Sequence, residues 1–158
     1  MSETCDVILR LLAATVVGML IGLNRDARGR PAGMRTMGLV ALGAAMIAVT
    51  AAHIPLLHNQ PDAISRTLQG VIQGVMAGIG FLGAGVLLKH EATSEIHGMT
   101  TAAAIWATAA LGITAGLGLW AIFLTGAVLT LLLLVVAHPI EERFERWARQ
   151  KRADKAED

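Results

Sequence analysis

Long apolar stretches dominate this sequence and restrict what the chain can fold into. From Gly98 through Ala137 there is neither a charged residue nor a histidine, and other long runs are nearly free of charge. A helix rises about 1.5 Å per residue, so roughly 17 to 25 apolar residues cross a hydrocarbon layer about 30 Å thick. The chain meets this requirement at 7–23, 34–54, 68–88, 99–115 and 117–137. The sequence therefore predicts an all-α membrane protein with five transmembrane helices in a domain at 1–137.

The composition agrees with this class. Hydrophobic residues make up 54% of the chain and charged residues 16%, against about 25% charged in soluble domains. The uncharged stretch at 98–137 is too long for one span, because a single helix would measure about 60 Å. We therefore expect a hairpin at Gly116-Leu117-Gly118, with Trp120 at a membrane interface. The single cysteine, Cys5, excludes an internal disulfide and a CxxC motif.

Basic residues alternate between the segments that join the spans. They cluster in the first loop, the third loop and the tail, while the opposite side has only Arg10 and Arg66. Cytoplasmic loops carry the excess of lysine and arginine in membrane proteins. The alternation predicts an N-terminus outside the cell and a C-terminus in the cytoplasm.

Residues 138–158 follow the last predicted span. Ile140, Phe144, Trp147 and Ala148 lie at helical spacing with charged residues on the other faces, which predicts a short cytoplasmic amphipathic helical tail. A solvated end that frays after about Arg149 is the alternative.

Glycines recur through the third run. Gly78-Ile-Gly80-Phe-Leu-Gly83 matches the GxGxxG dinucleotide pattern, but no βαβ unit surrounds it, so nucleotide binding is disfavoured. Small residues at regular helical spacing let a second helix approach closely in lipid. We expect such packing, within the subunit or across a homo-oligomer, through Gly70, Gly74, Gly78, Gly80, Gly83 and Gly85. The alternative is a broken helix that exposes backbone groups to an ion, with Gln69 and Gln73 as its polar side chains. Further glycine pairs at this spacing are Gly18 with Gly22 and Gly112 with Gly116.

The most polar internal stretch, 24–36, joins the first two spans. One interpretation is a positive loop that orients the chain and touches anionic lipid. The other is a functional polar centre, in which Asp26 is the buried partner of Arg35 or of an ion. The predicted members of this centre are Arg25, Asp26, Arg35 and Thr36.

No residue pattern indicates catalysis. Thr100 and Thr101 have no sequence-near His or acid that would activate them, and the five histidines show no HxH or HxxxH spacing. We therefore expect no enzyme and no cofactor, and the sequence assigns no metal ligand.

Three blocks of sequence, in order over roughly 17–116, resemble the MgtC/SapB family of bacterial inner-membrane proteins. The first block begins with GLNRD at Gly22 and continues through AGMRT to LVALGA. The second begins with QG at Gln73 and contains GIGFLGAG. The third is HGMTTAA, which begins at His97. The motif residues of the last two blocks include Gln73, Phe81, Gly98, Thr100, Thr101 and Trp106. One departure is Asn24, where the family usually has a glutamate suited to a cation.

The resemblance implies a multi-pass protein of the bacterial inner membrane. It further implies a role in adaptation to low magnesium or host-like stress, as in virulence, through other membrane components. A cytoplasmic C-terminal domain found in many members is then absent here or supplied by another chain. Our first hypothesis is a regulatory protein, the second a small oligomeric channel or transporter for Mg²⁺ or another solute, and a membrane enzyme is a distant third. The expected partners are the lipid bilayer, a second copy and other membrane proteins, but no nucleic acid.

Overall fold

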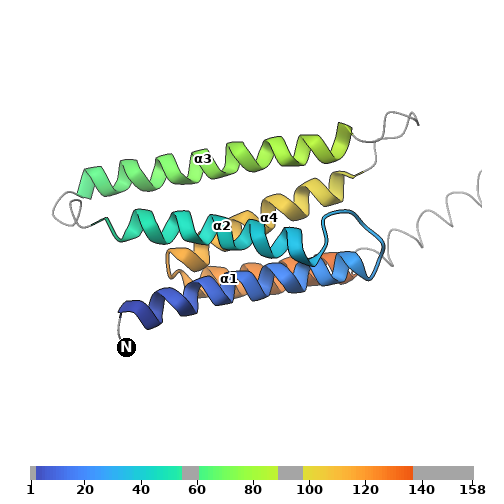
Figure 1. Ribbon diagram of the computed structural model, residues 1–158, viewed down its shortest axis with the longest axis horizontal. Coiled ribbons are helices and arrows are strands. Elements are labelled where there is room, and N and C mark those ends of the chain that lie inside the picture. Colours follow the sequence, from blue (N-terminus) through green and yellow to red (C-terminus); the bar gives the residue numbers. More distant parts are fainter. Residues whose placement is uncertain (1–2, 55–60, 89–97, 137–158) are drawn as a thin grey trace, which may run out of the picture.

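The computed structural model describes residues 3–54, 61–88 and 98–136. In these ranges five helices and no strand run side by side (Figure 1): α1 (Glu3–Asp26), α2 (Met34–Ala52), α3 (Pro61–Leu88), α4 (Met99–Gly116) and a last helix at Trp120–Val136. Four are long and apolar enough to cross a membrane, and the last is shorter. The all-α prediction is confirmed, and every predicted span overlaps one helix. The predicted tail at 138–158 lies outside the described residues.

The helix ends differ from the predicted spans. α1 and α3 begin before the predicted Val7 and Leu68, because hydropathy marks only the apolar part of a helix, whereas its backbone hydrogen bonds continue into polar residues. Asp62 in the first turn of α3 suits the positive end of the helix dipole. The last helix begins after the predicted Leu117, because the hairpin turn occupies the residues before Trp120.

α2 lies at the centre of the arrangement. It contacts α1, α3 and α4, and Figure 1 shows it between α1 and α3. Four glycines on the neighbouring helices face its backbone: a Cβ on Gly18 of α1 would lie 2.6 Å from Met37 O, and one on Gly116 of α4 would lie 2.5 Å from Ala45 O. A Cβ on Gly22 of α1 would collide with Met34 Cα, and one on Gly112 of α4 would collide with Ala41 O. The glycine pairs of the first and fourth spans therefore pack helix against helix, as their spacing predicts.

Alanines make up much of the interior, and many large apolar side chains cover the outside. Eight alanines of α2 and α4 are buried, whereas Leu39, Leu133 and Ile122 are more than half exposed. In lipid the outside of a bundle is apolar and small residues form the helix contacts. This distribution is that of a bundle surrounded by hydrocarbon.

The predicted hairpin between α4 and the last helix is confirmed. Gly118 has φ +71°, and the Leu119 N–H donates to Thr114 O at 2.9 Å, which closes the end of α4. Arg10 of α1 ties down this turn: its Nη1 donates to Gly116 O at 3.0 Å, while its Nη2 pairs with Asp6 at 2.6 Å.

Candidate functional site

A tight turn at the end of α1 gathers three arginines at one end of the bundle. Gly29, with φ +60°, adopts the left-handed conformation that closes a helix end. Its N–H donates to Asp26 O and the Arg30 N–H donates to Arg25 O, each at 3.0 Å. The chain folds back so that Arg25, Arg28 and Arg30 line the same cavity.

Arg25 is the only buried charged side chain in the described part of the chain, at 3% exposure. Its Nε donates to Pro31 O at 3.2 Å, and its Nη2 donates to Thr101 Oγ1 in the first turn of α4. Its Nη1 makes no hydrogen bond to the described residues. Arginine stays charged in proteins, and a charge is tolerated inside only when it is hydrogen bonded. Thr101 therefore helps to hold the charge of Arg25 between the helices.

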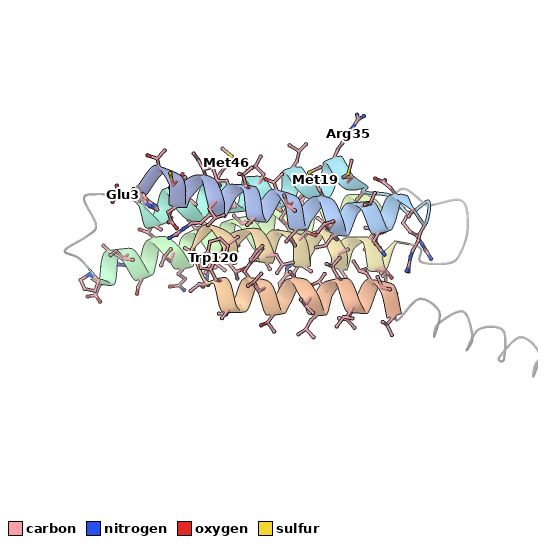
Figure 2. The ribbon with its side chains drawn as sticks, turned by 90° about the horizontal axis from the view of Figure 1, so that it is seen from below. Glu3, Met19, Arg35, Met46 and Trp120 are labelled. Atoms are coloured by element: carbon pink, nitrogen blue, oxygen red, sulfur yellow. The ribbon has the colours of Figure 1, made fainter. Side chains whose placement is uncertain are left out.

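Asp26 faces the other way and is exposed. Its Oδ2 accepts a hydrogen bond from the Met34 N–H at 2.8 Å, so the carboxylate caps the first turn of α2. A Cβ on Gly33 would collide with this carboxylate, which explains the glycine there. Arg35 is exposed and points away from the bundle (Figure 2), and no ion pair joins it to Asp26. The predicted buried pair of Asp26 and Arg35 is wrong, because the carboxylate binds the α2 backbone and the arginine lies on the outer face.

A cavity of about 270 Å³ lies beside Arg25, between α1, α4 and the last helix. Its polar lining comprises the three arginines with Asn24, Thr100 and Thr130, and the described residues contribute no carboxylate to it. Arg28 Nη1 also donates to Leu134 O at 2.8 Å, which ties the loop to the end of the last helix. The remaining wall is apolar and is formed by Ala103, Ala104, Ala107, Leu133 and Leu134. We call this space the basic cavity.

The donors of the basic cavity suit an anion. Guanidinium groups donate hydrogen bonds and accept none, and each arginine carries a full positive charge. Asn24, a departure from the motif of the family that the sequence resembles, also lines the cavity. Among the described residues, no three His, Cys, Asp or Glu side chains come together to hold a metal ion.

Sequence reasoning missed four of the polar lining residues, among them Thr130, which it did not single out. Arg28 and Arg30 counted there only as loop charge, and Asn24 only as a departure from the family motif. The available signal was Gly29 between two arginines, since a glycine just after a helix commonly turns the chain back on itself.

A second hollow, an apolar groove of about 680 Å³, lies between α2 and α3. The α2 wall includes Leu39, Gly43, Ile47 and the exposed Thr36, a predicted member of the polar centre that lies here instead. The α3 wall includes Gly70, Gly74 and Gly78. We call this space the glycine groove.

The predicted packing glycines of α3 have few neighbours. A Cβ would meet nothing within 4 Å at Gly70, Gly74, Gly78, Gly80 and Gly85. At Gly83 it would lie 3.3 Å from Ala102 Cβ of α4. Within the described part of the subunit, only Gly83 of these glycines packs against another helix, because α3 turns the bulkier Val75, Ile79 and Val86 toward the core. Packing of the other glycines against a second chain stays a prediction.

The motif residues of the second and third blocks occupy different environments. Gly98, with φ +99°, is the N-cap residue of α4, and Thr100 lines the basic cavity. Gln73 is exposed, and the exposed fractions of Phe81 and Trp106 are 81% and 52%. The motif at the start of α4 thus belongs to the basic cavity, whereas the other motif side chains face outward.

Comparison with known proteins identifies the family. Residues 11–143 match the sequence profile described as "MgtC family". The chain belongs to the MgtC family. It is 47% identical over 131 residues to "Protein SrpB" of Synechococcus elongatus, which covers 79% of this chain and 71% of SrpB. No solved structure matches it.

Two further relatives are longer than the region they share with this chain. The "Putative magnesium transporter YhiD" of Escherichia coli K12 is 35% identical over 89% of this chain and 64% of its own length. "Protein MgtC" of Salmonella typhi is 34% identical over 94% of this chain and 59% of its own length. The resemblance inferred from the three sequence blocks is confirmed, and the protein is a membrane protein of the MgtC family.

Proposed function

We propose that this protein is a regulatory component of the bacterial inner membrane that supports growth at low magnesium by binding other membrane proteins. The link to magnesium rests on the family and on the name of the YhiD relative. The observation that supports a binding role is the open glycine groove between α2 and α3. The distribution of basic residues supports an orientation with the basic cavity on the cytoplasmic side.

The glycine groove suits a transmembrane helix of a partner protein. From Gly70 to Gly78 the α3 wall extends for about 12 Å, or about two helical turns, and three of its lining residues are glycines, so a partner helix can approach the backbone at these points. The opposite wall offers Leu39 and Ile47, which are 68% and 48% exposed. Because close packing rather than hydrophobicity drives helix association in lipid, this combination favours a helix–helix contact.

Transport of Mg²⁺ or another solute is the second candidate, favoured by the name of the YhiD relative. Gln69 and Gln73, both exposed on α3, would then line a path between copies of the chain. Proteoliposomes that contain only this purified protein separate the two functions. The regulatory proposal expects no Mg²⁺ flux above that of empty liposomes, and flux by the pure protein would contradict it.

Growth in limiting magnesium tests the groove itself, in a bacterium deleted for its own MgtC-family gene. Gly78→Leu places a large side chain in the groove and should abolish rescue of growth. Gly80→Leu is the matched control, because Gly80 has open space around it but does not line the groove. Equal rescue by both variants, at equal amounts in the membrane, would refute the groove as the working surface. Light scattering in detergent then distinguishes a second copy from a different partner, since only self-association changes the size of the pure protein.

A further inference from the structure

Binding of a partner at the glycine groove assigns no role to the basic cavity. Three arginines converge on one small space at the end of the bundle, and among the described residues no carboxylate belongs to its lining. Asp26, the acid next to Arg25, is engaged on the Met34 N–H and is absent from the lining. The charge of the cavity is therefore uncompensated by the described residues around it.

Hydrogen-bond donors remain available in the cavity. Arg25 uses Nε and Nη2, which leaves Nη1 without an acceptor among the described residues. Arg30 is exposed and its side chain makes no hydrogen bond to the described residues. Thr100 adds a hydroxyl in the first turn of α4, where backbone N–H groups have no acceptor within the helix and the dipole is positive.

This set of donors matches a phosphate group. Arginine binds phosphate oxygens through paired N–H donors, and the N-terminus of a helix favours the same charge. The three guanidinium groups of the described lining would repel a cation.

The other half of the cavity is apolar. Ala103 and Ala107 of α4 line it together with Leu133 of the last helix, and from Thr100 to Ala107 the wall extends about 10 Å along α4. The apolar run of α1 ends at Leu23, so the arginines stand at the boundary between hydrocarbon and water. A ligand with a phosphate and a hydrocarbon chain would satisfy both halves of the lining.

We propose that the basic cavity binds a phosphate group, that of an anionic phospholipid whose acyl chain lies along α4 and the last helix. Basic pockets between transmembrane helices on the cytoplasmic side recognise anionic headgroups in this way. Inorganic phosphate offers the same chemistry without the chain, and the experiment below separates the two sources. The proposal is independent of the partner expected at the glycine groove.

Thermal unfolding of the full chain in a neutral detergent measures this binding, because a ligand of the folded state raises the midpoint with its concentration. The probes are dioctanoyl phosphatidylglycerol, dioctanoylglycerol, which has the same chains without phosphate, and inorganic phosphate. We expect saturable stabilisation by the phospholipid and none by dioctanoylglycerol.

Variants test whether the cavity is responsible. Arg30→Gln removes a charge that makes no hydrogen bond to the described residues, so it should leave folding intact and weaken phospholipid binding about tenfold. Arg35→Gln makes the same change on the outer face of α2 at this end, and it should alter binding less than about twofold. Ala103→Phe fills the apolar wall and should weaken binding of the phospholipid but not of inorganic phosphate.

Each result of these binding measurements either supports or overturns the proposed phosphate site. Stabilisation by inorganic phosphate alone, weakened by Arg30→Gln and not by Arg35→Gln, supports the phosphate site and assigns it to the free ion. The proposal is overturned if phosphatidylglycerol stabilises no more than dioctanoylglycerol and phosphate has no effect. Equal weakening by Arg30→Gln and Arg35→Gln also overturns it, because attraction would then be a general property of the basic surface.

Discussion

Contact between α1 and α2 at Gly18 offers the sharpest test of the packing. In Gly18→Ala the new Cβ would lie 2.6 Å from Met37 O and 2.8 Å from Ala41 Cβ, whereas ordinary contact begins at 3.4 Å. Both neighbours belong to the body of α2, so no flexible side chain can yield. The two helices must separate by about 0.8 Å to accept one methyl group.

The cost of that separation outweighs the benefit of alanine. A gap of about 0.5 to 1 Å forfeits a quarter to a half of the dispersion energy of each contact, and overpacking of this kind costs about 1 to 3 kcal/mol. Alanine is favoured over glycine inside a helix by about 0.5 to 1 kcal/mol. We expect a net loss of about 1 to 2 kcal/mol in the free energy of unfolding.

Gly78→Ala is the matched control on α3. A Cβ at this position meets nothing within 4 Å, so only the helix preference remains and the variant should gain about 0.5 to 1 kcal/mol in the isolated subunit. Unfolding by a denaturing detergent in mixed micelles, followed by circular dichroism, measures both. The same substitution should shift stability in opposite directions. A Gly18→Ala protein as stable as the wild type would refute the close approach of α1 and α2.

Three further predictions concern the orientation and the polar end of the bundle. Compartment reporters fused in the loop after α1 and in the loop after α2 should report opposite sides of the membrane, and the same side for both would contradict the predicted topology. Asp26→Ala should lower the free energy of unfolding by about 0.5 to 2 kcal/mol, because the cap of α2 is lost, and Arg35→Ala should lower it by at most about 1 kcal/mol. The loss in the double mutant should equal the sum of the two within about 0.5 kcal/mol. A larger coupling energy would show that the two side chains do pair. Thr101→Val removes a hydrogen-bond acceptor from the buried Arg25 and should lower the free energy of unfolding by about 1 to 3 kcal/mol. Thr100→Val, at an exposed neighbouring position, should change it little. Equal effects of the two substitutions in thermal unfolding would contradict the role of Thr101.

The sequence by itself determined the helices. Crossing hydrocarbon requires a continuous apolar stretch whose backbone bonds are satisfied within it, and this is a local property that composition displays directly. The sequence also predicted the turn at Gly118, because a single helix through 98–137 would be far longer than the membrane is thick. Membership of the MgtC family followed from three motif blocks and needed no tertiary information.

Only the tertiary structure decided which way the polar side chains point. Arg25 and Asp26 are adjacent in the sequence, yet a helix turns about 100° per residue, so one enters the bundle while the other caps α2. The spacing of the glycines likewise does not predict their surroundings. Gly18 and Gly78 each belong to a series of glycines four residues apart, yet Gly18 lies against the α2 backbone and Gly78 faces open space. Spacing defines a face of a helix, but what that face meets depends on how the other helices are placed around it.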